Sequence, residues 1–191
     1  MNKKARLAIG VASLAVLVAA SVVVYDVFSD RVDTSDRVAI PDSGGEPADR
    51  ELAPDFAMTD WAGNGIRLSD ITARGRPVIL NFWASWCPPC EAEMPDFDRV
   101  HADFGDEVEF VMLSVTDGVR ETVETGRRFI EDGGFAMPVF FDTSREGAIA
   151  YGVRSIPTTL FIDGDGYVIT GVQGAIDEDI LRRVVDFMLD S

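Results

Sequence analysis

Between residues 81 and 95 the chain reads Asn81-Phe82-Trp83-Ala84-Ser85-Trp86-Cys87-Pro88-Pro89-Cys90-Glu91-Ala92-Glu93-Met94-Pro95. The apolar run that ends near Trp83 is suited to a strand buried on both faces of a sheet. A helical pattern then begins at Cys87 and gives the helix one apolar side, formed by Met94, Phe97, Val100 and Phe104. The two cysteines of this 191-residue chain therefore stand at the junction of a buried strand and a helix.

Three interpretations of this cysteine pair are open. A structural disulfide between Cys87 and Cys90 would close so short a loop that it removes little entropy from the unfolded chain. A zinc site of the common types needs more ligands than two Cys and one His supply. A redox pair would use the helix start, where free N–H groups and the helix dipole stabilise the Cys87 thiolate. Cys90, one turn further on, would then resolve a mixed disulfide. The redox interpretation is favoured.

The pattern on both sides of this segment predicts an α/β fold. Strand-like runs at 77–83, 108–115 and 137–141 alternate with helical patterns, one of them marked by Val119, Val123, Phe129 and Ile130. Residues 55–60 and 65–68 flank a turn and predict a hairpin, as do 158–162 and 167–172. A short helix over 145–151 and a last helix over 178–189, with Asp177 as N-cap, complete the pattern. We expect a central mixed sheet flanked by helices.

The first 52 residues read differently from the rest. Lys3, Lys4 and Arg6 precede an uncharged, mostly aliphatic run over 7–25, long enough for a hydrocarbon core of about 30 Å. The positive-inside tendency places the start in the cytoplasm and the rest outside. We therefore predict a single-pass anchor in the cytoplasmic membrane over residues 1–28 and a flexible linker over 29–52, with a cleaved signal peptide as the alternative. The folded domain is predicted over 53–191.

The charge of the chain excludes one class of partner. There are 17 Lys and Arg residues against 33 Asp and Glu, a formal net charge of −16. Binding to a phosphate backbone requires clustered cations, so nucleic acid is not expected as a partner. With 47% hydrophobic and 26% charged residues the composition is that of an ordinary globular protein. The acidic balance itself indicates no function.

The segment around the cysteines resembles the active-site segment of the thioredoxin superfamily. It is most similar to the membrane-anchored, extracytoplasmic TlpA/ResA-like branch, which is of the redoxin (AhpC/TSA) type. A second stretch agrees, because residues 151–159 resemble the family segment with a cis-proline opposite the disulfide, here Pro157. The resemblance covers about residues 54–189. It implies a thioredoxin-like fold in which the residues between 119 and 141 form the helix and strand that this branch inserts.

The resemblance also implies a role for each matching residue. Cys87 would be the attacking thiolate and Cys90 the resolving thiol of a redox-active disulfide. Trp86 would shield one side of the sulfur pair and contact substrate, with a place in the core as its alternative. A cis peptide bond at Pro157 would leave the backbone of Ile156 free to pair with an extended substrate.

One position departs from plain thioredoxins, which carry a buried Asp six residues before the first cysteine. Here that position is Asn81, which cannot titrate. In the TlpA/ResA-like branch a Glu three residues after the second cysteine is usual, and Glu93 stands there. One turn beyond Cys90, Glu93 would have a raised pKa if buried and would relay a proton. The alternative is a solvated carboxylate like Glu91.

We therefore expect a thiol–disulfide oxidoreductase outside the cytoplasmic membrane that reduces disulfide-bearing proteins. The resemblance implies electrons from a membrane thiol-transfer reductase, and substrates that include the haem-binding cysteines of apocytochromes c. No organic cofactor or metal is expected. Alternatives are an oxidase that installs disulfides, a peroxiredoxin-like antioxidant protein, and a non-enzymatic copper-binding module. The copper-binding module is weakened by the isolation of the only histidine, His101.

Overall fold

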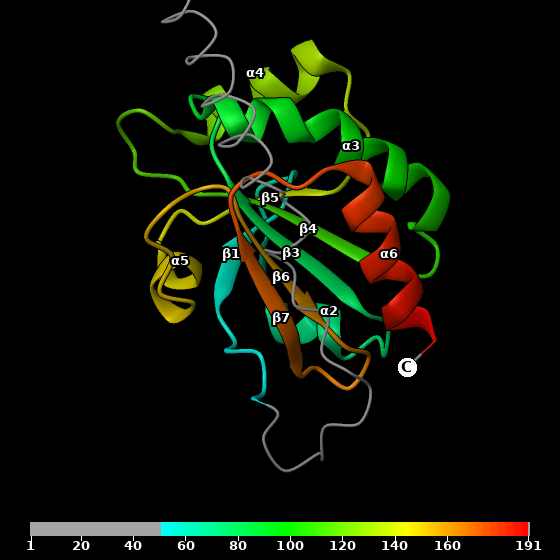
Figure 1. The fold of residues 1–191 in the computed structure, drawn as a ribbon. Helices are drawn as coiled ribbons and strands as arrows, with labels where there is room; N and C mark the ends of the chain where they lie inside the picture. The colour runs from blue at the N-terminus through cyan, green and yellow to red at the C-terminus, as the bar shows by residue number, and fades with distance from the viewer. Residues whose placement is uncertain (1–50, 191) are drawn as a thin grey trace, which may run out of the picture. The chain divides into compact units, whose positions relative to one another are not determined.

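The structure, a computed structural model, describes residues 51–190 (Figure 1). The predicted anchor (1–28) and nearly all of the predicted linker (29–52) lie outside the described residues. Within 51–190, no helix combines the length and the apolar character that crossing a membrane requires. What the structure shows therefore concerns the domain that carries both cysteines.

Seven strands form one mixed sheet in the order β2-β1-β5-β4-β3-β6-β7. In chain order they are β1 (Ala57–Thr59), β2 (Gly65–Arg67), β3 (Val78–Trp83), β4 (Glu109–Ser114), β5 (Val139–Phe141), β6 (Thr158–Ile162) and β7 (Val168–Gln173). β4 runs parallel to both β3 and β5, whereas the other pairings are antiparallel. The predicted mixed sheet and both predicted hairpins are confirmed.

Helices cover both faces of this sheet (Figure 1). They are α2 (Leu68–Thr72), α3 (Pro88–Phe104), α4 (Val123–Gly133), α5 (Glu146–Ala150) and α6 (Glu178–Leu189). Buried residues of α3, α4 and α6 share one apolar cluster, and those of α2 belong to a second. α5 packs closely on the second cluster, because a Cβ added at Gly147 would lie 2.7 Å from the ring of Phe56. The expected α/β layering is therefore confirmed.

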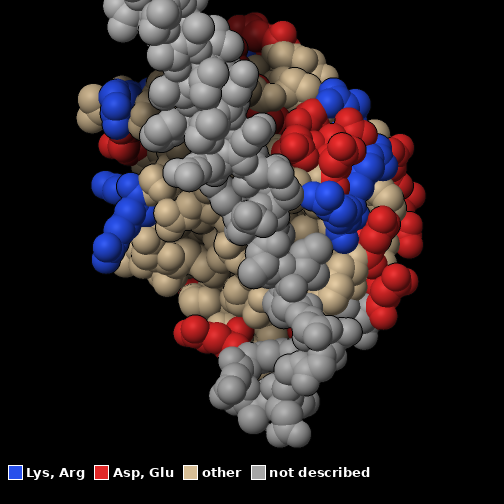
Figure 2. All heavy atoms as spheres, viewed as in Figure 1, with Lys and Arg blue, Asp and Glu red and all other residues tan. Residues whose placement is uncertain are grey.

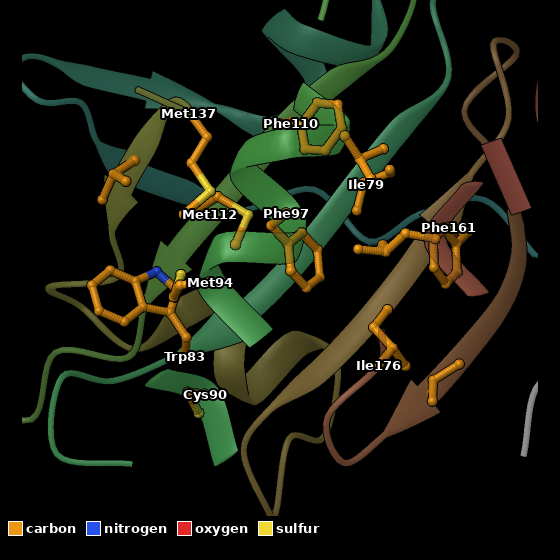
Figure 3. Close-up of a cluster of buried hydrophobic side chains, with 14 of the residues drawn as sticks. Ile79, Trp83, Cys90, Met94, Phe97, Phe110, Met112, Met137, Phe161 and Ile176 are labelled. Carbon is orange, nitrogen blue, oxygen red and sulfur yellow. The ribbon is translucent and has the colours of Figure 1, made fainter. Parts of the chain in front are cut away.

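Strand β3 is the centre of the core. All six of its residues are buried, and alternate side chains enter opposite clusters, Ile79 and Trp83 on one face and Leu80 and Phe82 on the other. Figure 3 shows the first cluster, with Cys90 at one end of it. A strand buried on both faces explains the unbroken apolar run in the sequence.

The register of β3 with its neighbours brings three loops to one end of the sheet. Phe82 of β3 lies opposite Thr158, the first residue of β6. Trp83 lies opposite Ser114, the last residue of β4. The segment after β3, the segment before β6 and the loop after β4 therefore emerge side by side, and the cysteines follow β3 at this end.

The chain enters the domain at the opposite end of β6. The Ala53 N–H donates to the Gly166 carbonyl at 2.9 Å, and the Val168 N–H donates to the Glu51 carbonyl at 2.9 Å. Leu52 forms an isolated bridge with Tyr167 between these bonds. Among the described residues, Glu51, Leu52 and Ala53 thus pair with the β6–β7 hairpin.

Two elements differ from their predicted positions. Leu68, predicted to end a strand, is the first residue of α2, because the Asp70 carboxylate accepts the Arg67 N–H at 2.8 Å and closes the helix start. Val119, predicted to lie on an amphipathic helix, is 85% exposed in the loop before α4. That helix begins only after Thr122, whose side chain accepts the Thr125 N–H at 3.1 Å.

Acidic and basic side chains are mixed on the face seen in Figure 2. A network of ion pairs joins α3 and α6. The Arg99 Nε donates to Glu178 at 2.7 Å, and Arg99 also pairs with Asp96. Arg182 pairs with Glu178 at 2.8 Å and with Asp103 at 2.5 Å. These exposed arginines offset part of the acidic charge where the two helices meet.

The N-cap of α6 is expected to contribute measurably to stability. The Asp177 side chain accepts the Ile180 N–H at 2.9 Å, which satisfies one free donor of the first turn. Asp177→Ala is expected to lower the free energy of unfolding by about 1 kcal/mol in urea titrations. The control is Asp179→Ala, an exposed residue of the same turn. An equal loss in both variants would assign the effect to charge rather than to the cap.

Candidate active site

Cys87 and Cys90 are joined by a disulfide at the start of α3. Cys87 is the N-cap of the helix and is 3% exposed, whereas Cys90, in the first turn, is fully buried. Pro88 and Pro89 occupy the first two helical positions, where the missing N–H groups would have no partner within the helix. The Cys90 N–H points at the Cys87 sulfur at 3.4 Å. Of the two sulfurs, that of Cys87 is the one closer to solvent.

The segment before β6 faces this disulfide. The Ile156–Pro157 peptide bond is cis, as predicted from the family resemblance. The Ile156 carbonyl oxygen lies 3.6 Å from the Cys87 Sγ. Because Phe82 pairs with Thr158, the residues that follow β3 and those that precede β6 are held against each other by the sheet itself. The structure therefore brings Cys87, Ile156 and Pro157 together, although they are about 70 residues apart in the sequence.

Glu93 is buried inside the domain, one turn of α3 beyond Cys90. The side chain is 2% exposed and accepts two hydrogen bonds, from Asn81 Nδ2 at 2.9 Å and from the Ile176 N–H at 3.0 Å. Burial raises the pKa of Glu93 to about 7, against the two hydrogen bonds, which lower it. The burial on which the predicted raised pKa depends is therefore present, and the alternative of a solvated carboxylate is wrong. At neutral pH, Glu93 can therefore either give or take a proton.

Asn81 links Glu93 to strand β6. Its Nδ2 also donates to the Thr159 hydroxyl at 3.0 Å, while its Oδ1 is buried without a hydrogen-bond partner among the described residues. Turning the amide over would let Oδ1 accept a hydrogen bond from a protonated Glu93 and another from the Thr159 hydroxyl. Asn81, which cannot titrate, can therefore form a hydrogen bond with Glu93 in both the carboxylate and the carboxylic acid form.

Trp86 lies at the surface beside the disulfide. Its side chain is 42% exposed, so the alternative that placed it in the core is wrong. The guanidinium carbon of Arg120, from the loop after β4, lies 3.8 Å from the centre of the Trp86 ring. This cation–π contact covers one face of the Trp86 ring.

Glu121 is a further residue at this end of the sheet, and the sequence analysis missed it. It is fully buried and accepts hydrogen bonds from the Ser85 N–H at 2.9 Å and the Ser85 hydroxyl at 2.6 Å. The Ser114 hydroxyl donates to its other oxygen at 2.9 Å. Glu121 thus fastens the loop after β4 to the residues just before the cysteines. No spacing pattern in the sequence indicates such a contact.

The part of the chain that the structure describes contains no group of three or more His, Cys, Asp or Glu residues arranged to hold a metal ion. His101 is on α3 and packs the edge of its ring against Phe110, with the ring centres 5.2 Å apart.

A cysteine pair held in this way can exchange one disulfide for another. One sulfur is near the surface at a helix start, the second is buried behind it, and a carboxyl group that titrates near neutral pH lies one turn beyond. On a thioredoxin-like sheet, this arrangement defines the class of thiol–disulfide oxidoreductases.

Comparisons with known proteins agree with this class. Residues 50–170 match the AhpC/TSA family. The chain is 33% identical over 184 residues to thiol-disulfide oxidoreductase ResA of Geobacillus kaustophilus, covering 96% of both chains. A thiol:disulfide interchange protein of the thioredoxin family from Chlorobium tepidum has a similar structure, with a TM-score of 0.65 and 27% identity, covering 75% of this chain and 99% of that one. StoA from Bacillus subtilis matches with a TM-score of 0.59 and 26% identity, covering 68% and 95%.

The chain belongs to the AhpC/TSA family, and within it to the TlpA/ResA-like branch of the thioredoxin superfamily. The expected class of enzyme, a thiol–disulfide oxidoreductase acting on disulfide-bearing proteins, is confirmed by these relatives.

Proposed function

We propose that this protein reduces protein disulfides on the extracytoplasmic side of the cytoplasmic membrane, held there by residues 1–28 as a single-pass anchor. The observation that carries the proposal is the pairing of an outer sulfur, Cys87, with an inner sulfur, Cys90, next to a carboxyl group with a pKa of about 7. The cationic start and the apolar run over 7–25 support the anchor and its orientation.

The reaction begins from the dithiol form. The Cys87 thiolate attacks one sulfur of a substrate disulfide, the substrate S–S bond breaks, and the second substrate sulfur leaves as a thiolate that takes up a proton. Glu93 in its carboxylate form removes the proton from the Cys90 thiol. The Cys90 thiolate then attacks the Cys87 sulfur and the mixed disulfide breaks, so that the substrate sulfur bound to Cys87 leaves as a thiolate and takes up a proton. The two cysteine thiols have then given two electrons to the substrate and form the Cys87–Cys90 disulfide.

The surface around Cys87 suits an extended polypeptide. Ile156 stands just before β6 and its carbonyl oxygen lies 3.6 Å from the Cys87 Sγ. The Ile156 backbone can pair with a substrate strand that runs past the sulfur, as in β-strand addition. Trp86 offers an exposed aromatic face on the other side. A substrate bound between them would present its disulfide to Cys87.

The two prolines favour the reducing direction. Pro88 and Pro89 remove two N–H donors that would otherwise stabilise the Cys87 thiolate, and the Cys90 N–H remains at 3.4 Å. A strong oxidant requires a very stable thiolate, with a pKa near about 3.5 in the extreme case. The spent disulfide would then be reduced again by a membrane thiol-transfer reductase. Among substrates we favour the haem-binding cysteines of apocytochromes c, as the family resemblance implies.

The reduction potential of the full-length protein tests the direction. Equilibration with glutathione or dithiothreitol buffers is expected to give a value near or below about −270 mV, that of thioredoxin. A value near about −120 mV, that of a strong oxidant, would overturn the proposal in favour of disulfide formation. Labelling of Cys87 in intact cells with a membrane-impermeant thiol reagent tests the location, and protection from the reagent until the membrane is broken would contradict it.

A further inference from the structure

Glu121 is a buried carboxylate for which the proposed reaction has no use. It ends the loop between β4 and α4, is 0% exposed, and lies in a loop closed by its own hydrogen bonds. The Asp117 carboxylate accepts the Glu121 N–H at 2.9 Å, and the Glu121 carbonyl accepts the Asp117 N–H at 3.0 Å. The loop therefore presents the Glu121 side chain in a fixed direction, towards the residues before Cys87.

All the hydrogen-bond donors that Glu121 meets are neutral. They are the Ser85 N–H, the Ser85 hydroxyl and the Ser114 hydroxyl. No arginine in residues 51–190 forms an ion pair with Glu121, and its neighbour Arg120 instead lies over Trp86 and 3.7 Å from Asp117. A buried carboxylate without a cation keeps more of its electrostatic effect than an exposed one, because water screens it less.

Ser85 belongs to a tight turn that ends at Cys87. The Cys87 N–H donates to the Ala84 carbonyl at 3.1 Å, so the Cα atoms of Ala84 and Cys87 are within about 7 Å. Ser85 is the second residue of this turn, and Glu121 holds both its N–H and its hydroxyl. Glu121 is therefore hydrogen-bonded to the residue two positions before Cys87, inside the turn that ends at Cys87.

We propose that Glu121 is a positioning residue that fixes the turn before Cys87 and, through its negative charge, disfavours the Cys87 thiolate, which makes the cysteine pair more reducing. This inference rests on the proposed function and deepens it. At an effective dielectric constant of about 20, a unit charge about 12 Å away shifts a pKa by roughly 1 unit. Glu91 and Glu93 on α3, and Arg120 and Asp117 in the loop of Glu121, are charged groups of the same segments, and a substitution at Glu121 removes none of them.

Glu121→Gln separates the charge from the hydrogen bonds. The Gln carbonyl can accept both donors of Ser85, and the Gln amide can donate to the Ser114 hydroxyl, so the shape of the site is kept. The measurement is the pKa of Cys87 in the reduced full-length protein, from the pH dependence of its alkylation by iodoacetamide. We expect the pKa of Cys87 to fall by roughly 1 unit. At a pH above the Cys87 pKa, the equilibrium with glutathione is expected to shift about tenfold towards the dithiol, about 30 mV.

Two further variants make the outcome decisive. Glu124→Gln removes the same charge from an exposed position three residues away and is expected to leave the pKa of Cys87 unchanged. Ser85→Ala keeps the charge but removes one hydrogen bond, so it is expected not to lower that pKa. An unchanged Cys87 pKa in folded Glu121→Gln overturns the proposal, and so does an equal fall in Glu121→Gln and Ser85→Ala. Because each comparison is with the unaltered protein, an oxidising potential of that protein would refute the proposed direction without deciding the role of Glu121.

Discussion

Cys87→Ser is expected to abolish disulfide reduction by this protein, whereas Cys90→Ser is expected to stop the reaction at the mixed disulfide. In an insulin-reduction assay with dithiothreitol, both variants should lose activity by on the order of 10³-fold or more. The reason is the different position of the two sulfurs, because Cys87 is at the helix start and Cys90 is fully buried. Cys87, the less buried of the two, is therefore the cysteine that we expect to meet the substrate.

The trapped species distinguishes the two variants. Cys90→Ser lacks the thiol that releases the substrate, so it should form a covalent adduct that non-reducing electrophoresis detects and dithiothreitol removes. Cys87→Ser should form no such adduct, because Cys90 is buried. An adduct of equal yield in both variants would contradict the assignment of the attacking sulfur. Mass spectrometry of the Cys90→Ser adduct from cells would also identify the physiological substrate.

Glu93→Gln is expected to slow disulfide exchange by on the order of 10²-fold at neutral pH. It should also remove a step near pH 7 from the pH–rate profile. Burial raises the pKa of Glu93 to about 7, which lets the carboxylate accept the proton of Cys90 in the pH range where exchange is measured. Gln has the same shape but cannot accept that proton. The measurement is the rate of insulin reduction between pH 5 and 9, with Glu91→Gln, an exposed residue of the same helix turn, as control.

The same variant is expected to change the pH dependence of stability. The folded protein holds a proton on Glu93 up to about pH 7, whereas the unfolded chain releases it near 4.5. The folded state therefore binds more protons between these values, and Glu93 makes the protein less stable as pH rises through this window. The loss amounts to about 3 kcal/mol at pH 8. The free energy of unfolding of Glu93→Gln, measured in urea at several pH values, should lack this loss. An equal dependence of that free energy on pH in both proteins would contradict the burial of a titrating carboxyl group.

The sequence predicts the elements that follow from local patterns. The apolar run over 77–83 gives a fully buried β3, and the helical spacing after Cys87 gives α3. The spacing of Cys90 and Glu93 predicts that they lie close together, because residues three apart lie on one face of a helix. The position of Pro157 opposite the disulfide is predicted by the resemblance of its segment to a family motif and not by any local pattern.

The contacts that the sequence does not reveal join distant segments. Ser85 and Glu121 are separated by 36 positions, and Asn81 and Thr159 by 78. Each contact depends on the order of strands in the sheet, which no periodicity records. In the sequence, nothing distinguishes Glu121 from the other Asp and Glu residues of this acidic chain. Val119 fits the helical spacing of the residues after it. The helix nevertheless starts at Val123, because Thr122 caps it there, and the spacing alone does not indicate this cap.

Residues 51–53 join the sheet beside the turn of the β6–β7 hairpin, at a distance from the redox pair. Residues 51–53 are paired with Gly166, Tyr167 and Val168, while the disulfide lies beyond the other end of β6, next to Pro157. At about 3.3 Å per residue, the five residues of β6 separate these points by roughly 15 Å. A force applied to the domain through residue 51 therefore acts at the end of β6 that is away from Cys87 and Pro157, and it does not act directly on the residues around the redox pair.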